Sequence, residues 1–269
     1  MKSSTSKKKR TFKIGLPTFV ILTAIFLSLL AYHFIFGNPA NFQGNNPENQ
    51  PIPGNYFGVV YKGGFIVPIL MSLLIIVLTF SIERYYAIQK ARGKGSVTLF
   101  VKEIQHLLSN GQVDDAIKAC DEQKGSVANV VVSVLRRYET AEKEKNVTKE
   151  QQLVSLQKEI EEATALELPG LEENLIILAT LSSVSTMIGL LGTVLGMIRA
   201  FAALANAGAP DSVALAGGIS EALINTALGI STAALAIIFY NYLTNKIDKL
   251  MYSIDEAGFS IVQTYAAKH

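Results

Sequence analysis

The sequence has 269 residues, of which 49% are hydrophobic and only 17% are charged. An ordinary soluble domain carries about 25% charged residues, so this composition predicts several membrane spans instead of one or two soluble domains. The formal net charge of +2 gives no indication of nucleic-acid binding. Because the chain contains a single cysteine, Cys120, it cannot build a disulfide framework or a thiolate metal cluster by itself.

Four stretches of the chain are apolar, nearly free of charge and long enough to cross a bilayer, which takes about 20 helical residues. The predicted transmembrane helices are 16–36, 63–83, 174–205 and 213–245. The first stretch follows a basic run at residues 7–10, so a cleaved signal peptide is an alternative interpretation. Its apolar run is longer than the hydrophobic region of a signal peptide, which favours a membrane helix.

The basic residues predict the orientation of these helices, because Lys and Arg concentrate on the cytoplasmic side. Residues 1–15 are strongly basic and are assigned to the cytoplasm. With four spans, all basic residues except Lys62 and Arg199 then fall inside, and the tail 246–269 is also cytoplasmic. The turn 206–212 lies outside and makes the third and fourth spans an antiparallel hairpin.

The outer segment 37–62 is rich in Asn, Pro, Gly and Gln, which predicts an irregular tether without a hydrophobic core.

The inner segment 84–173 has the apolar spacing and capping residues of a helical domain. Ser96, Asp114 and Thr148 are the predicted N-caps of three of its helices, and Pro169-Gly170 predicts a kink or break before the third span. Two interpretations of this domain stay open: a cytoplasmic collar that packs against neighbouring subunits, or a solvated domain without such partners. The expected fold is therefore an all-α integral membrane protein with four transmembrane helices and a helical cytoplasmic domain.

The third span carries a stripe of small and polar residues on one helix face. Gly192 and Gly196 form a GxxxG pair, which permits close approach of another backbone. Four more residues follow the same face at helical spacing: Ser182, Thr186, Gly189 and Thr193. The stripe predicts either tight helix packing, with hydroxyls bonded to their own backbone, or a hydrated or partner-facing wall.

The fourth span contains Glu221, the one ionisable residue well inside a predicted span. A carboxylate at membrane depth is costly and therefore suggests a function, such as handling of protons or cations, although a structural hydrogen-bond acceptor is the alternative. Asn225 lies one turn on from Glu221, whereas Thr226 lies about 140° away, on a stripe that includes Gly229. Two polar stripes indicate that this helix faces two different surroundings.

The sequence lacks the common catalytic and nucleotide-binding motifs. It contains no HExxH, GxSxG, P-loop or GxGxxG motif. We therefore predict that the chain is not an enzyme and binds no cofactor, metal or nucleic acid.

The hairpin resembles a known family. Residues 188–197 (IGLLGTVLGM) are similar to the penultimate span of the ExbB/TolQ/MotA proton-channel family. Residues 218–229 (GISEALINTALG) resemble the last span of ExbB, and residues 239–241 continue that match. Residues 82–84 fit the exit of the family's first span.

The resemblance implies a subunit of a proton-driven motor in the bacterial inner membrane. ExbB-like subunits form a pentamer around the membrane helices of an ExbD-like dimer, which supplies a transmembrane aspartate that takes up and releases the proton. The motor drives a TonB-like protein that opens outer-membrane transporters. By motif, the family's two threonines and one glutamate beside the proton path fall on Thr193, Thr226 and Glu221.

Two departures from the family pattern are visible. The chain has an extra first span, which preserves the orientation of the rest, and it has Thr186-Met187 where the family often has a proline. The alternatives to an ExbB-like role are a TolQ-like or gliding-type stator subunit and, from other classes, a solute transporter or a membrane scaffold. The sequence shows no convincing internal repeat of the kind common in transporters.

Overall fold

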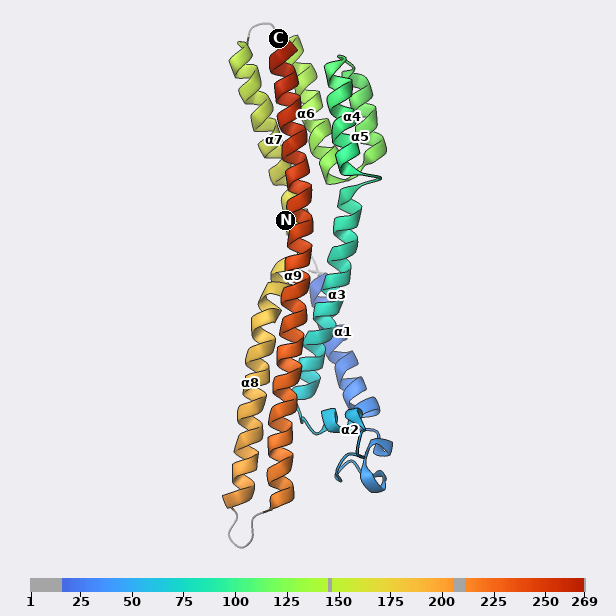
Figure 1. Cartoon of the computed structure of the whole chain (residues 1–269), viewed down its shortest axis with the longest axis vertical. Helices are drawn as coiled ribbons and strands as arrows, with labels where there is room; N and C mark the ends of the chain where they lie inside the picture. The colour runs from blue at the N-terminus through green and yellow to red at the C-terminus, as the bar shows by residue number, and fades with distance from the viewer. Residues whose placement is uncertain (1–15, 145–146, 206–210, 269) are drawn as a thin grey trace, which may run out of the picture. The chain divides into compact units, whose positions relative to one another are not determined.

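The computed structural model describes residues 16–144, 147–205 and 211–268. These residues form helices and loops, with one isolated antiparallel bridge and no strand (Figure 1). In chain order the elements are α1 Leu16–Leu30, η1 Ala31–Phe36, η2 Pro39–Asn41, η3 Gln43–Asn45, α2 Tyr56–Tyr61, α3 Ile66–Arg92, α4 Val97–Ser109, α5 Val113–Gln123, α6 Gly125–Lys143, α7 Lys149–Glu172, α8 Leu175–Ala205 and α9 Ser212–Lys268. The all-α prediction is confirmed.

Four helical segments are long and apolar enough to cross a membrane: Pro17–Phe36, Ile66–Ser109, Leu175–Ala205 and Ser212–Lys268. Apolar, uncharged stretches form helices in lipid because the helix satisfies every backbone hydrogen bond within the segment. The prediction of a multi-pass membrane protein is confirmed. The exact membrane boundaries and the orientation stay predictions, and residues 1–15 and 206–210 lie outside the described residues.

The chain divides into two compact units, each described separately below. One unit comprises Met1–Thr79 and Leu181–Ala234, and the other comprises Phe80–Thr180 and Leu235–His269. The helices α3, α8 and α9 each contribute residues to both units.

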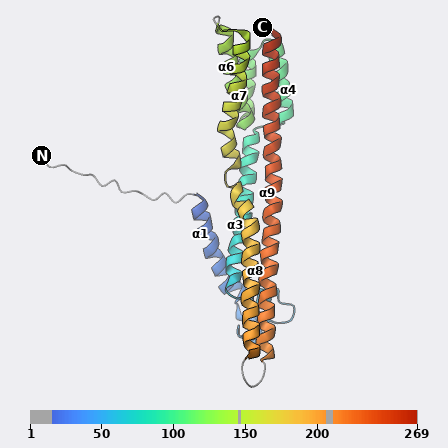
Figure 2. The ribbon, with the colours of Figure 1, turned by 90° about the vertical axis from the view of Figure 1, so that its left-hand side faces the viewer.

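In the first unit, α8 and the N-terminal part of α9 lie side by side as an antiparallel hairpin (Figure 2). Their shared face is lined by small residues, whereas large apolar side chains such as Leu190, Val194 and Leu223 are exposed. Exposed leucine and valine side chains are expected on a helix that faces lipid or another apolar surface. The hairpin is therefore an apolar body with a polar, small-residue seam.

The segment between α1 and α3 is ordered, which corrects the prediction of a tether without a core. Phe42 is buried and packs edge-on against Tyr61, whose ring stacks on Tyr32 at a centroid distance of 4.8 Å. The side-chain amide of Asn41 donates to two carbonyls at the end of the first span, and Asn55 caps α2. The prediction failed because these asparagines satisfy the backbone polar groups of an irregular chain, which lets its few aromatic residues form a core.

In the second unit, α4 packs on α5, α5 on α6 and α6 on α7 (Figure 1). Thr148 caps α7 as predicted and forms a capping box with Gln151. Ser96 occupies the N-cap position of α4 as predicted, but its side chain forms no capping hydrogen bond. Asp114 was expected as the N-cap of α5, but that helix begins at Val113, so Asp114 lies in its first turn. An acidic side chain in the first turn still stabilises the positive end of the helix dipole.

The break before α8 lies a turn later than predicted. Pro169 is accommodated inside α7, which continues to Glu172. The chain turns at Asn174, whose φ of 62° lies in the left-handed region that asparagine tolerates better than most residues. Next to this junction the buried guanidinium of Arg84 donates to the carbonyl of Gly170 at 3.2 Å and pairs with Glu83.

Candidate functional site

Glycines bring the backbones of α8 and α9 into direct contact along the hairpin. A methyl group added to Gly229 would lie 2.7 Å from the carbonyl oxygen of Ser185, and one added to Gly196 would lie 2.7 Å from the carbonyl oxygen of Gly218. A methyl group at Gly189 would lie 3.0 Å from the Cα of Gly229. Side chains at these positions would push the helices apart, so the glycines set the spacing at which polar groups of α8 and α9 meet.

Between these glycine contacts, two threonine hydroxyls from different helices meet. Thr193 Oγ1 on α8 and Thr226 Oγ1 on α9 lie within hydrogen-bond distance of each other. Each hydroxyl also lies 3.2 Å from a carbonyl one turn earlier, Thr193 from Gly189 and Thr226 from Ala222. Both side chains are half-buried. Because a hydroxyl both donates and accepts, the pair can relay a hydrogen bond to a water or a polar group beside the hairpin.

Glu221 is buried and paired with Arg199 of α8. Its carboxylate oxygens each lie 2.7 Å from one guanidinium nitrogen of Arg199, whose side chain is 53% exposed. A methyl group at Gly64, which has a φ of +74°, would lie 2.5 Å from Glu221 Oε1, so a glycine is needed there for the carboxylate to fit. The negative charge of Glu221 is thus compensated within the chain.

Asn225 lies one turn from Glu221 and links α9 to the segment before α3. Its side-chain nitrogen donates to the carbonyl oxygen of Gly63 at 2.9 Å, and its side chain fills the space beside Gly192. The side-chain oxygen of Asn225 is buried without a hydrogen-bond partner among the described residues. The stripe with Thr226 thus meets α8, whereas the stripe with Glu221 and Asn225 meets both α8 and residues 63–64.

A cavity of about 600 Å³ opens beside Glu221. It is lined by residues of the segment between the first two spans, including Glu48 and Lys62, and by the first turns of α9 from Val213 to Glu221. The ammonium group of Lys62 donates to the carbonyl oxygens of Pro47 and Glu48 at 2.8 and 3.0 Å. Burial lowers the pKa of Lys62. A cavity of this volume, lined by polar and charged groups, is large enough to hold water beside the paired carboxylate.

The remaining stripe residues have local partners. Thr186 Oγ1 donates to the carbonyl oxygen of Ser182, one turn earlier on α8, at 3.3 Å. Glu221 has Arg199, not a threonine, as its hydrogen-bond partner in α8. Among the described residues, no group of three or more His, Cys, Asp and Glu is placed to hold a metal ion.

Sequence reasoning missed Arg199 as the partner of Glu221. Arg199 is the one basic residue at the outer end of the third span, and its position opposite Glu221 in the hairpin was the available signal. The Gly63-Gly64 pair before α3 was a second signal, since it permits the approach of Glu221 and Asn225.

Residues 130–256 match the model of the MotA/TolQ/ExbB proton channel family. This range contains all of α8 and most of α9, including both threonines and Glu221. The family is a class of proton channels and not of enzymes.

Individual relatives match shorter or longer parts of the chain. The chain is 43% identical to a Tol-Pal system protein TolQ of Haemophilus influenzae over 84 residues, 31% of this chain and 37% of that protein. It is 39% identical to a protein named ExbB-like 3 from Synechocystis sp. over 84 residues, 30% of this chain and 40% of that protein. These two alignments thus span less than half of each relative.

A longer alignment extends beyond the hairpin. The chain is 27% identical to a biopolymer transport protein ExbB of Neisseria meningitidis over 199 residues, 73% of this chain and 87% of that protein. This similarity agrees with the family match and with the four apolar helices. Residues 130–256, slightly less than half of the chain, are thus similar to the MotA/TolQ/ExbB proton channel family.

Proposed function

We propose that the protein is an ExbB-like subunit of a proton-driven motor in the bacterial inner membrane. In this proposal several copies, five by resemblance to the family, surround an ExbD-like partner, and proton flow through the complex drives a TonB-like protein. Its termini face the cytoplasm, as the distribution of Lys and Arg indicates.

The observation that carries the proposal is the contact between the Thr193 and Thr226 hydroxyls. The pair lies between helices of an otherwise apolar hairpin, where a hydroxyl costs free energy unless it has a hydrogen-bond partner. A hydroxyl can orient water or pass on a hydrogen bond, but it does not hold a proton as a stable charge at neutral pH. A proton path along these threonines therefore needs an ionisable acceptor.

That acceptor is assigned to the partner. None of the four predicted spans contains an aspartate, and the buried carboxylate of Glu221 is already compensated by Arg199. An aspartate on a partner helix beside the threonines would supply the missing group. Glu221 then borders the path at its outer end, where the cavity of about 600 Å³ admits water.

A TolQ-like role is the second candidate, because the relative at 43% identity is a Tol-Pal system protein. Both roles use the same hairpin chemistry and differ in the energised partner. They are distinguished by complementation in bacteria that lack their own ExbB and TolQ, with this chain expressed together with the ExbD-like protein of its own organism.

The expected result is recovery of TonB-dependent uptake of an iron complex. Recovery of detergent tolerance without uptake would favour the TolQ-like role, and recovery of neither function would contradict both. Thr226→Val should abolish the recovered activity without loss of protein from the membrane. Thr180→Val is the matched control, because the hydroxyl of Thr180 on α8, like that of Thr226 on α9, donates to the carbonyl one turn earlier, but its side chain is exposed.

A further inference from the structure

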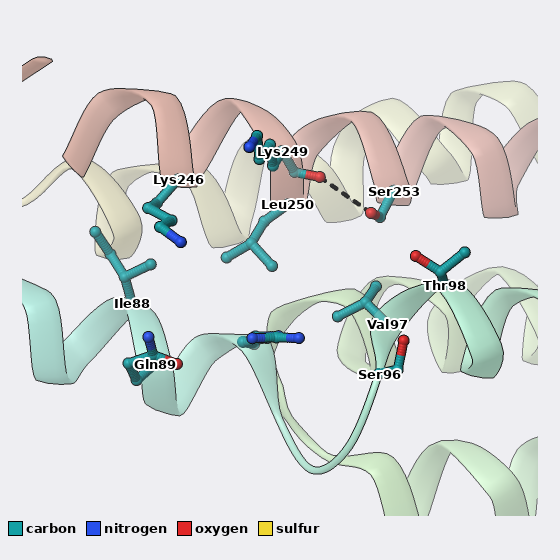
Figure 3. Close-up of a pocket in the computed structure, with 10 residues that line it drawn as sticks. Ile88, Gln89, Ser96, Val97, Thr98, Lys246, Lys249, Leu250 and Ser253 are labelled. Atoms are coloured by element: carbon teal, nitrogen blue, oxygen red, sulfur yellow. Dashed lines mark hydrogen bonds between the residues drawn. The ribbon is translucent and has the colours of Figure 1, made fainter. Parts of the chain in front are cut away.

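The second unit contains a groove with a basic half and an aromatic half. The basic half is a cavity of about 250 Å³ between the end of α3, the start of α4 and the middle of α9 (Figure 3). Its apolar floor consists of the buried side chains Ile88, Val97 and Leu250. Charged and polar side chains surround this floor.

Three cationic side chains line the basic half: Arg92, Lys246 and Lys249. None of them forms an ion pair with a residue that the structure describes, and no carboxylate is among the residues that line this cavity. Figure 3 shows Lys246 extending from α9 toward α3, between the two helices. Three uncompensated positive charges around one cavity make it a site for an anion.

Uncharged hydrogen-bond donors around the cavity also favour binding of an anion. The helix α4 begins at the cavity, and the side chain of Ser96 before it does not cap the first-turn N–H groups. The side chains of Gln89 and Thr98 also line the cavity. Ser253 is already engaged, since its hydroxyl donates to the carbonyl oxygen of Lys249 at 3.0 Å (Figure 3). Arginine and lysine together with free N–H groups are the donors that recognise phosphate.

The aromatic half of the groove is a neighbouring cavity of about 290 Å³ between α3 and α9. It is lined by Ser81, Ile82, Tyr85, Tyr86, Phe239, Tyr242 and Leu243. The ammonium group of Lys246 lies 5.4 Å from the centre of the Tyr242 ring, so the basic and aromatic halves meet at these two residues. Tyrosine side chains with an apolar body and a polar tip are typical of the membrane–water interface.

We propose that this groove binds an anionic phospholipid, with the phosphate in the basic half and an acyl chain along the aromatic half. The observations favour a lipid over a free phosphate ester because the anion site continues into an apolar, tyrosine-lined cavity. The position fits this ligand: the predicted spans end at residues 83 and 245, immediately before the basic residues. The inference rests on the proposed cytoplasmic position of this end of the spans, and it is independent of proton conduction.

Binding to the full-length protein in neutral detergent tests the proposal. Native mass spectrometry would compare dioleoylphosphatidylglycerol with dioleoylphosphatidylcholine, and glycerol 3-phosphate would serve as the free phosphate ester. We expect retained phosphatidylglycerol at concentrations where phosphatidylcholine is lost. Neutralising Arg92, Lys246 and Lys249 together, each to Gln, should reduce that preference roughly 100-fold, since a basic residue near an anionic surface contributes about 1 kcal/mol.

A matched variant removes three other basic residues from the same end of the unit. Lys90→Gln, Lys94→Gln and Lys124→Gln change the net charge equally, but these exposed side chains do not line the groove. This control should keep the preference for phosphatidylglycerol. An equal loss in both triple variants would indicate a general basic belt and would overturn the proposal.

Two further outcomes would also overturn the proposal. One is equal binding of the two lipids by the unaltered protein, and the other is binding of glycerol 3-phosphate without retention of phosphatidylglycerol. If the triple variant fails to fold, the single charge reversal Lys246→Glu gives the test, because it opposes a phosphate at the junction with Tyr242. Unchanged phosphatidylglycerol binding by a folded Lys246→Glu variant would contradict the assigned site.

Discussion

At the scale of single residues, Glu221 illustrates how a carboxylate is kept within an apolar hairpin. Its side chain is only 7% exposed, and Arg199 supplies the compensating charge from the facing helix. Because Arg199 is itself half exposed, solvent reaches the guanidinium and weakens the pair relative to a fully buried one. Removal of the arginine still leaves a buried, unpaired carboxylate, which is the costly state.

Because Glu221 is buried and Arg199 is half exposed, substitutions of the two residues should have non-additive effects on stability. Arg199→Gln should lower the apparent stability in detergent by about 2 kcal/mol, because Glu221 loses its partner. Glu221→Gln should cost less, since the exposed guanidinium can be solvated. The double variant should be more stable than Arg199→Gln alone. Thermal unfolding of the four proteins checks this, and strictly additive effects would contradict the proposed pairing.

Tyr138 on α6 provides a prediction for pH. Its side chain is fully buried, its hydroxyl has no hydrogen-bond partner among the described residues, and burial raises its pKa to about 12 from an ordinary value of 10.0. A raised folded-state pKa means that stability is complete below pH 10 and declines as the unfolded chain releases its proton between pH 10 and 12.

Tyr138→Phe should therefore remove part of the loss of stability between pH 10 and 12. At pH 7 it should change stability by no more than about 1 kcal/mol, because no hydrogen bond is lost. The edge-on packing against the Tyr265 ring, at a centroid distance of 4.8 Å, remains available to phenylalanine. Denaturation curves of both proteins at pH 7 and pH 11 check the prediction, and a large loss at pH 7 would reveal a partner for the hydroxyl.

At the scale of elements, the α8–α9 hairpin depends on which glycines lie in its seam. Gly217 and Gly218 are adjacent on α9, yet they face different surroundings. A methyl group at Gly218 would lie 2.6 Å from the backbone nitrogen of Ala200, whereas one at Gly217 would meet no atom within 4 Å. Comparing substitutions at Gly217 and Gly218 therefore separates the role of glycine in helix packing from its low helix propensity.

Gly218→Ala should destabilise the hairpin by about 1–3 kcal/mol, because the helices must move apart. Gly217→Ala should have no such cost and should gain up to about 1 kcal/mol from better helix propensity. Thermal unfolding in the same detergent compares the two variants. Equal destabilisation by both would contradict the close approach of α8 and α9 at this point.

The sequence predicts elements better than connections. The membrane helices follow from their apolar runs, and the start of α7 follows from the capping residue Thr148, because these signals act within a few turns of one helix. Signals within one turn could not predict the packed structure of residues 37–62 or the position of the helix break at Asn174. The first depends on contacts between aromatic residues distant in sequence, and the second on which residue adopts a left-handed conformation.

In the candidate site, too, the position of each residue on its helix could be predicted from the sequence, but its partner on another helix could not. Spacing along each helix places Thr193, Thr226 and Glu221 on small-residue or polar faces, which sequence alone reveals. The pairing of Thr193 with Thr226 and of Glu221 with Arg199 depends on the relative register of two helices. That register is set by backbone contacts at glycines, which periodicity within one helix does not specify.

At the scale of the whole molecule, the chain supplies hydroxyls and a compensated carboxylate, but its predicted spans contain no aspartate. The exposed apolar side chains on α8 and α9, such as Val194 and Leu223, need lipid or another protein surface around them. Both features are explained if copies of the chain enclose a partner helix.

Assembly can be measured directly. Native mass spectrometry of the full-length protein in detergent should show a homo-oligomer, because a surrounding ring buries the apolar faces of the hairpin. Thr226→Val should form an oligomer with the same number of subunits, since it exchanges a hydroxyl for a methyl group of similar volume. A stable monomer as the main species would contradict the ring arrangement.

The central claim, that the chain provides a path whose proton acceptor lies on another protein, is tested by proton flux into liposomes under a membrane potential, followed with a pH-sensitive dye. The protein alone should be nearly impermeable to protons. Co-purification with the proposed ExbD-like partner should produce a flux that Thr226→Val abolishes. A comparable flux through the protein alone, or an undiminished flux through the Thr226→Val complex, would contradict the account.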